Sequence, residues 1–138
     1  MDVLKIPFVE TVGITKTADG KLELAFKKDV QNHLETVHAS AQFTLAETAS
    51  GEALQQQFPE LVGKVVPLLR DSEVKFKKPA LQNIYAEASI SDESRSKFKE
   101  QFSKKGRAAI GVDVTVKDAE GTVTCVGAFN WLVQSMES

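Results

Sequence analysis

The sequence predicts an α+β domain in which an antiparallel sheet of five to six strands packs against one long helix. Two observations indicate this fold class. The stretch from Ala39 to Gln57 contains no proline and a single glycine, which favours an uninterrupted helix. Elsewhere, apolar and polar residues alternate over several short stretches, which is typical of strands with one buried face. With 138 residues and no repeat or low-complexity linker, the chain is expected to form a single domain over residues 1–138.

The first half of the chain contains a predicted hairpin followed by the long helix. Two extended segments between Val12 and Phe26 flank Asp19-Gly20, a dipeptide typical of tight turns. In the helix, apolar residues recur every three or four positions and define a stripe: Ala39, Phe43, Ala46, Ala49 and Ala53. Pro59 is expected to help end the helix. The many small residues either let it approach a curved sheet closely or reflect the high helix propensity of alanine.

Two further strands and a surface helix are predicted in the second half. The strands cover residues 64–78 and 82–91, with Pro79 in the turn between them. Residues 92–105 are mostly charged, yet they place two phenylalanines four positions apart: Phe98 and Phe102. A short surface helix held to the core by these two rings is therefore expected.

The last third of the chain predicts a long antiparallel hairpin. Apolar residues alternate with others on both sides of a turn at residues 118–121. The alternating residues are Ile110, Val112, Val114 and Val116 before the turn, and Val123, Cys125, Gly127, Phe129 and Trp131 after it. This hairpin supplies two of the longest strands of the predicted sheet.

The charge balance argues against nucleic acid or an anionic membrane as the main partner. The chain has 17 basic and 19 acidic residues, so no strong overall field attracts either. No stretch approaches the roughly 18 apolar residues that a membrane-spanning helix requires. The beginning of the sequence contains neither the apolar core of a signal peptide nor a transit-peptide pattern. We therefore expect a cytoplasmic protein.

The cysteine and histidine content predicts neither a disulfide nor a metal site. Cys125 is the single cysteine, and it shares a predicted strand face with Val123 and Trp131, so a buried, unreactive thiol is expected. His33 and His38 lie five residues apart without a third ligand at a recognised spacing. No bound metal is expected.

The segment from Asn32 to Gly51 has the most specific pattern in the chain. A loop asparagine, Asn32, is followed by His38, by small residues that open the helix, and by Glu47 nine positions after the histidine. This order resembles the hotdog-fold acyl-CoA thioesterases, especially the phenylacetyl-CoA type and an uncharacterised branch related to it. The similarity extends over roughly residues 7–133. It implies a hotdog fold, a homodimer or homotetramer, an acyl-CoA substrate bound where two subunits meet, and no cofactor beyond the substrate's own coenzyme A.

The resemblance also implies roles for individual residues. Asn32 would orient water or substrate, His38 is the histidine before the helix, and Glu47 would act as general base or nucleophile. Backbone N–H groups at Ala39 and Ser40 would polarise the thioester carbonyl, an effect on the order of 3 kcal/mol. Apolar neighbours in the helix are expected to desolvate the Glu47 carboxylate and raise its pKa.

Three positions depart from the family pattern. Glu35 stands where glycine is common, Ala39-Ser40 stands where two glycines are common, and Glu47 replaces the frequent aspartate. An N–H at a helix start donates whatever its side chain, but an added Cβ reduces the room beside the carbonyl. Hydrolysis of an acyl thioester is therefore the leading hypothesis, and a non-catalytic hotdog module that binds acyl thioesters is the alternative. A hydratase is a third hypothesis, although its usual histidine motif is not evident.

The spacing between His38 and Glu47 predicts a site shared by two chains. At about 1.5 Å per residue, the helix separates them by roughly 13 Å, too far for both to act on one carbonyl. Under two-fold symmetry, the helix start of one subunit would meet Glu47 of the other, giving two composite sites per dimer.

Basic clusters at 75–78 and 104–107 are either solvated surface or contacts for coenzyme A phosphates.

Overall fold

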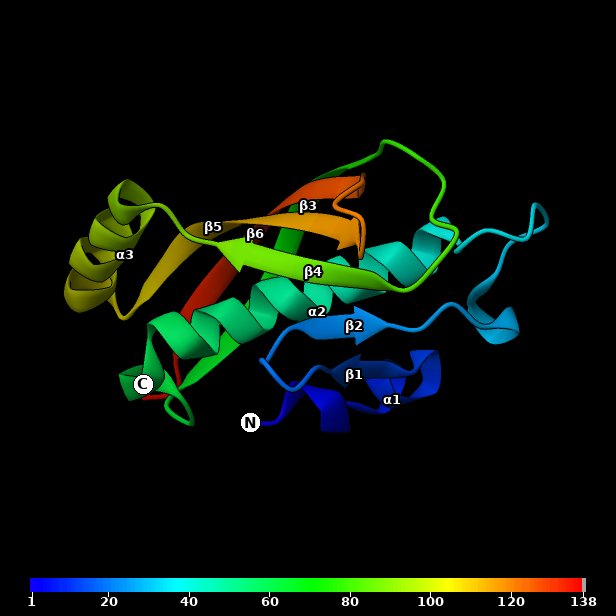
Figure 1. Ribbon diagram of the computed structural model, residues 1–138. Helices are drawn as coiled ribbons and strands as arrows, with labels where there is room; N and C mark the ends of the chain where they lie inside the picture. Colours follow the sequence, from blue (N-terminus) through cyan, green and yellow to red (C-terminus); the bar gives the residue numbers. More distant parts are fainter. Residues whose placement is uncertain (138) are drawn as a thin grey trace.

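A computed structural model describes residues 1–137 and shows a six-stranded antiparallel sheet curved around one long helix (Figure 1). The sheet order is β1-β2-β4-β5-β6-β3. The strands are β1 (Ile14–Lys16), β2 (Leu22–Leu24), β3 (Val65–Phe76), β4 (Ile84–Ser89), β5 (Arg107–Asp118) and β6 (Val123–Ser135). The helices are α1 (Pro7–Val12), α2 (Ala39–Gln57) and α3 (Asp92–Lys105), with 3₁₀ turns η1 (Val3–Lys5), η2 (Lys28–Val30) and η3 (Pro59–Leu61). The predicted α+β architecture is confirmed.

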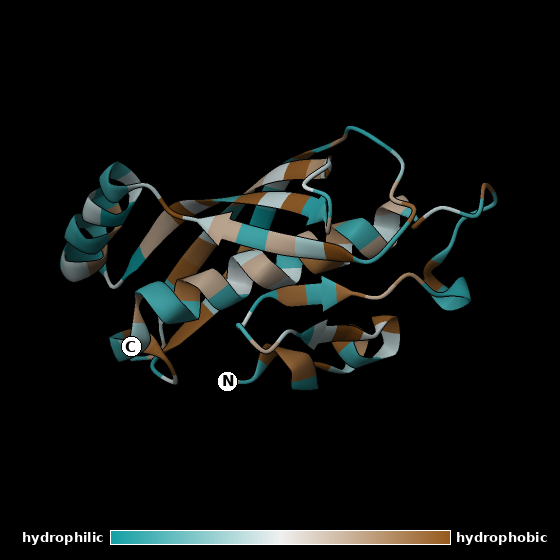
Figure 2. Ribbon diagram, in the orientation of Figure 1, coloured by the Kyte–Doolittle hydropathy of each residue, from teal (hydrophilic) through white to brown (hydrophobic). Residues whose placement is uncertain are grey.

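The long elements occupy the predicted residues. Helices α2 and α3 begin and end where the sequence places them, and the predicted hairpins appear as β1–β2 and β5–β6. Helix α3 is almost wholly hydrophilic in Figure 2, as expected of a surface helix. Its Phe98 is nevertheless buried and packs on Phe58 and Phe102, with ring centroids 4.9 and 5.5 Å apart. Within residues 1–137, none of the helices combines the length and apolar character needed to cross a membrane.

The N-terminal segment differs from the sequence prediction, which placed no element before residue 12. It forms η1 and the six-residue helix α1. Pro7 stands in the first turn of α1, where its missing N–H has no intrahelical partner to lose. Gly13 ends the helix with φ 92° and donates its amide to the Val9 carbonyl at 3.0 Å. Six residues are too few to reveal helical periodicity in the sequence.

Strand β3 lies at the edge of the sheet. The predicted strands at 64–78 and 82–91 form as β3 and β4, but they are not neighbours, because β4 lies between β2 and β5 while β3 pairs with β6. Most of the 12 residues of β3 are exposed. They include three large apolar side chains with exposed fractions of 44%, 46% and 49%: Val66, Leu68 and Phe76. This long edge offers unpaired backbone groups to another strand.

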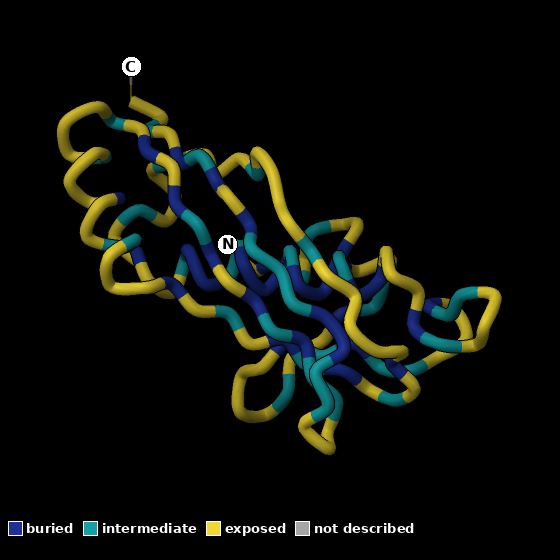
Figure 3. Tube along the Cα trace, turned by 90° about the horizontal axis from the view of Figure 1, so that it is seen from above, coloured by how far each residue is buried: buried dark blue, intermediate teal, exposed yellow. Residues whose placement is uncertain are grey.

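More residues of α2 are buried than the predicted apolar stripe contains. Ala39 is exposed, so that member of the stripe was wrong, whereas the half-buried Phe43 packs on Phe129 of the core with ring centroids 5.5 Å apart. The buried set instead includes four polar residues: Gln42, Thr44, Thr48 and Ser50. Because the sheet curves around α2, the helix is enclosed on several sides, and buried segments gather in the middle of the molecule in Figure 3. Small side chains allow this close approach.

A β-bulge in β6 turns one polar residue inward. Val116 pairs with Cys125 and Lys117 pairs with Val123, which leaves Thr124 as an extra residue in β6. The Thr124 hydroxyl donates to Gln42 Oε1 at 2.8 Å, and both residues are buried. The sequence alternation predicted the opposite orientation, because a bulge adds one residue to the period of two.

Candidate functional site

A pocket of about 460 Å³ lies along one face of α2. The helix contributes residues at three- and four-residue spacing: Thr44, Glu47, Thr48, Gly51 and Leu54. The N-terminal segment forms another wall with Val3, Ile6 and Phe8, and the sheet contributes Val65, Trp131 and Val133. Phe58 and Phe98 line the part of the pocket nearest the C-terminal end of α2. The lining is therefore mostly apolar.

Glu47 places a carboxylate in this apolar pocket. Its side chain is half-buried, and burial raises the pKa of the carboxyl above its ordinary value. Among residues 1–137, no hydrogen bond or ion pair reaches this carboxylate from another side chain or from the backbone. A raised pKa without a fixed partner suits a group that takes up and returns a proton.

The two threonines beside Glu47 do not supply competing donors. Thr44 donates its hydroxyl to the Ser40 carbonyl at 2.9 Å, and Thr48 donates to the Thr44 carbonyl at 2.6 Å. Both hydroxyl protons are therefore used within the helix. The methyl groups add to the apolar character of the pocket, and Glu47 is left as the charged side chain at this position.

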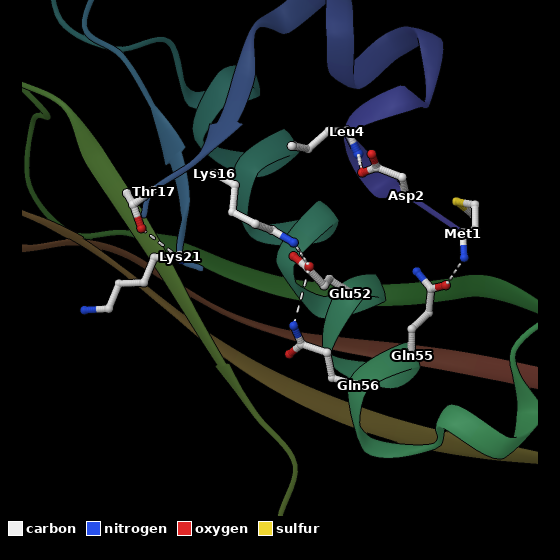
Figure 4. A network of polar contacts seen from close by, with 9 residues as sticks. All are labelled: Met1, Asp2, Leu4, Lys16, Thr17, Lys21, Glu52, Gln55 and Gln56. Carbon is white, nitrogen blue, oxygen red and sulfur yellow. Dashed lines mark hydrogen bonds and ion pairs between the residues drawn. The ribbon is translucent and has the colours of Figure 1, made fainter. Parts of the chain in front are cut away.

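Polar contacts attach the N-terminal wall to α2 (Figure 4). The Met1 amino group donates to Gln55 Oε1 at 3.0 Å, and Asp2 accepts the Leu4 amide at 2.9 Å, which caps η1. On the adjacent strand β1, Lys16 forms an ion pair with Glu52 of α2. Gln55 itself lines the pocket, and Glu52 follows the lining residue Gly51 in α2, so these contacts hold the N-terminal wall against the pocket-lining part of the helix.

His38 caps the start of α2. Its Nδ1 atom accepts the Ser40 amide at 2.9 Å, and the preceding backbone is extended. One of the two amides predicted to polarise a carbonyl therefore already has an acceptor in this chain. Among residues 1–137, no acceptor is found for the amide of Ala39, the first residue of the helix.

Asn32 organises the loop before the helix. Its Oδ1 atom accepts the amides of Leu34 and Thr36 at 2.9 and 3.1 Å, and its Nδ2 atom donates to Thr36 Oγ1 at 2.9 Å. Glu35 has φ 62° in the same loop. The left-handed conformation explains why glycine would suit this position better, and Glu35 adopts it at a cost of about 1 kcal/mol.

One chain does not bring all five predicted site residues together. Glu47 lines the pocket in the middle of α2. The other four lie at the start of α2 or in the loop before it: Asn32, His38, Ala39 and Ser40. None of these four belongs to the pocket lining within residues 1–137. Their catalytic roles and the site shared by two chains stay predictions.

Cys125 is buried in β6, as predicted. Burial raises the pKa of its thiol to about 11. At neutral pH the thiol is therefore protonated, which does not suit a nucleophile.

The family comparison decides where this chain belongs. The model of a family described as a domain of unknown function, DUF4442, matches residues 1–133. The chain belongs to the DUF4442 family. A search of curated proteins finds no match.

Solved structures similar to this DUF4442 chain confirm the hotdog fold. PA5026 of Pseudomonas aeruginosa, called a protein of unknown function and probable thioesterase, has a TM-score of 0.82 at 22% identity, over 96% of this chain and 91% of its own. The thioesterase HI1161 of Haemophilus influenzae has a TM-score of 0.77 at 16% identity, over 99% and 88%. BH2602 of Bacillus halodurans, solved with CoA, has a TM-score of 0.70 at 22% identity, over 91% and 74%.

Several pocket residues were not predicted from the sequence. Thr44, Thr48 and Gly51 share the face of Glu47, and their three- and four-residue spacing was a signal that could have identified them. Trp131 was expected only as a core residue of β6. Its indole N–H donates to Ser50 Oγ at 3.0 Å, which fixes the ring as a wall of the pocket.

Proposed function

We propose that this chain hydrolyses acyl-CoA or a closely related acyl thioester, with Glu47 as the general base or nucleophile. The observation that carries the proposal is the Glu47 carboxylate, which is half-buried, has a raised pKa, finds no partner among residues 1–137 and lines an apolar pocket. An acyl chain occupying the pocket would bring its thioester carbonyl to this carboxylate. The thioesterase HI1161 and the CoA-bound BH2602 among the similar structures support this substrate class.

As a general base, Glu47 would remove a proton from water while the water oxygen attacks the carbonyl carbon. Negative charge would then develop on the carbonyl oxygen, and the Ala39 amide at a helix start is a suitable donor to it. Collapse of this intermediate would break the carbon–sulfur bond. The proton held by Glu47 would pass to the leaving thiolate, which releases free thiol and a carboxylic acid. As a nucleophile, Glu47 would attack the carbonyl carbon and expel the thiolate, which leaves a mixed anhydride. Water would then open the anhydride, which restores the Glu47 carboxylate and releases the carboxylic acid, and a proton from solvent would convert the thiolate to free thiol.

Two chains are proposed to build each site. The Ala39 amide and Glu47 lie about eight residues apart along α2, which is roughly 12 Å at 1.5 Å per residue. The exposed edge of β3, with its large apolar side chains, is a suitable surface for self-association. A two-fold axis near this edge would bring the helix start of one subunit toward Glu47 of its partner.

The helix start also supports a second candidate, a non-catalytic module that binds acyl thioesters. The Ser40 amide is occupied by His38, so fewer donors are free for a developing oxyanion than a pair of open amides would provide. In this case the pocket would hold the acyl group without hydrolysis.

Thiol release from a panel of acyl-CoAs separates the two candidates. We expect turnover by the unmodified chain, followed with a thiol reagent. Binding of acyl-CoA by isothermal titration calorimetry, without any thiol release, would favour the module instead.

A mixed-dimer experiment tests the shared site. Glu47→Gln and Ala39→Pro remove the base and the N–H donor respectively, and Pro is well tolerated in the first helical turn. Random refolding of equal amounts makes half the dimers mixed, and each mixed dimer contains one intact composite site of two. Activity is therefore expected to return to about a quarter of the unmodified level. Mixed dimers confirmed by mass spectrometry, with activity no higher than that of either variant alone, would rule out the shared site.

A further inference from the structure

The apolar lining and the length of the pocket beside Glu47 determine which acyl group fits. We propose that it takes a straight aliphatic acyl chain of medium length, and that Gly51 keeps the passage along α2 open for that chain. This inference rests on the proposed function, in which the thioester carbonyl lies at Glu47.

The lining selects an uncharged chain. Apart from Glu47, the described lining residues have no charged side chain. The hydroxyl protons of Thr44 and Thr48 are used within α2, so these residues present mainly methyl groups. Among the described lining residues, the cationic group is the Met1 amino group, which already donates to Gln55 Oε1 at 3.0 Å. An acyl group with a second carboxylate would also lie near the Glu47 carboxylate. Such a group is therefore disfavoured, whereas methylene groups gain by leaving water.

The length of the pocket follows from the helix that forms it. Eleven residues separate Glu47 from Phe58, which corresponds to roughly 16 Å at 1.5 Å per residue. An extended alkyl chain advances about 1.25 Å per carbon, given C–C bonds of about 1.52 Å. Phe58 and Phe98 are almost fully buried, pack on each other and line the pocket near this end of α2. At this advance per carbon, a chain of about twelve to fourteen carbons would reach these rings.

Gly51 lies one helical turn beyond Glu47 on the same face. Its φ is not positive, so the backbone does not require glycine here. Glycine in a helix interior is less favourable than alanine, which indicates that the missing side chain has a use. A Cβ at this position would meet the Trp131 ring at 3.5 Å, an ordinary contact. Any larger side chain would extend into the pocket, because Ser50 holds the Trp131 ring.

The first test is the chain-length profile with straight-chain acyl-CoAs from C4 to C16. For the unmodified protein, kcat/KM should rise to a maximum near C12 or C14. In Gly51→Leu, the ratio of kcat/KM for C12 to that for C4 should fall at least tenfold, and Gly51→Ala should give a smaller fall. Gln56→Leu is the matched control, because it adds a large apolar side chain at an exposed position of the same helix, outside the pocket lining. Its ratio should not change.

The second test measures binding without turnover. Trp131 is the single tryptophan and lines the pocket, so its fluorescence should respond to an occupant. In a Glu47→Gln background, dodecanoyl-CoA should change the emission in a saturable way, and adding Gly51→Leu should weaken this binding at least tenfold.

The outcomes separate the inference from the proposed function. Absence of turnover with every acyl-CoA would overturn the proposed function, whereas saturable binding of dodecanoyl-CoA lost in Gly51→Leu would still support the pocket assignment. Turnover with a flat chain-length profile, or a profile unchanged in Gly51→Leu, would overturn the inference alone. A change of mass by light scattering in Gly51→Leu, with the profile unchanged, would show that a second copy of the chain fills the pocket. If Gly51→Leu does not fold, the chain-length profile of Gly51→Ala tests the inference instead, because alanine favours the helix and this variant is expected to fold.

Discussion

Buried polar groups on two sides of α2 differ in whether they have a hydrogen-bond partner. On the side facing β6, Gln42 accepts the Thr124 hydroxyl at 2.8 Å, and Ser50 accepts the Trp131 indole N–H at 3.0 Å. On the side facing the pocket, the Glu47 carboxylate has no partner within residues 1–137. The first side is typical of a core in which buried polar atoms are satisfied.

This difference distinguishes the hydrogen-bonded pairs of Gln42 and Ser50, which stabilise the fold, from Glu47, which is available for chemistry. A hydrogen-bonded buried pair fixes the position of the helix on the sheet, and losing one partner destabilises the protein. An unpaired, partly desolvated carboxylate destabilises the folded state instead, because burial disfavours its charge. The pocket side of α2 therefore contains a group whose presence is explained by function more readily than by stability.

The largest effect expected away from Glu47 is at the start of α2, and it tests whether the Ala39 amide acts together with the pocket. Ala39→Pro removes one N–H while keeping helical geometry, since His38 already has the extended backbone that a following proline requires. Loss of one oxyanion donor should lower kcat by about 10²- to 10³-fold. Thiol release from an acyl-CoA measures this, and Ala39→Gly, which keeps the N–H, is the control. Full activity in Ala39→Pro would remove this amide from the mechanism.

A smaller effect is expected on the β6 side. Gln42→Leu leaves the buried Thr124 hydroxyl without its acceptor and should lower the free energy of unfolding by about 1–3 kcal/mol. The double variant Gln42→Leu/Thr124→Val removes both partners and should recover most of this loss. Urea denaturation measures both values. If the double variant is no more stable than Gln42→Leu, the pair does not hold α2 in the way proposed.

The third prediction concerns Cys125, which takes no part in the proposed reaction. Because its thiol is buried and has a pKa of about 11, it should react with a thiol reagent at pH 8 at least about 100-fold more slowly than in guanidinium-unfolded protein. Absorbance with an aromatic disulfide reagent follows the reaction. Rapid modification of the folded chain would show that β6 opens readily, and it would also complicate thiol-release assays.

Much of the fold could be predicted because its elements are long and regular. Helix α2 has no proline within it, β5 alternates over most of its 12 residues, and β6 alternates in its second half. Helix α1 has too few residues to show a period, and the Thr124 bulge shifts the alternation by one residue. The edge position of β3 depends on long-range pairing with β6, which neighbouring residues do not encode.

The candidate site was predicted in part. Glu47 was identified through resemblance to a family, because a helical glutamate is most often exposed. Its desolvation was anticipated from the small apolar residues around it, and the raised pKa agrees. The pocket itself was not predicted, since three of its walls come from the N-terminal segment, the sheet and α3. The hydrogen bond from the Ser40 amide to His38 Nδ1 was also not predicted, because it depends on the His38 rotamer, which the residue spacing does not reveal.

The most direct test of Glu47 as an unpaired catalytic carboxylate is to measure the activity and the stability of the Glu47→Gln variant. Burial raises the pKa of Glu47 in the folded state above its ordinary value of 4.5, so folding favours the protonated carboxyl. Below that ordinary value both states are protonated and this carboxyl has no effect on stability, whereas raising the pH through the raised pKa destabilises the folded state. Gln has nearly the same shape and no charge. The variant should therefore lose thiol release at least about 10³-fold and be more stable than the parent at pH 7, with the two stabilities converging near pH 4. Retained activity, or a variant less stable than the parent at pH 7, would contradict the assignment of Glu47 as an unpaired catalytic carboxylate.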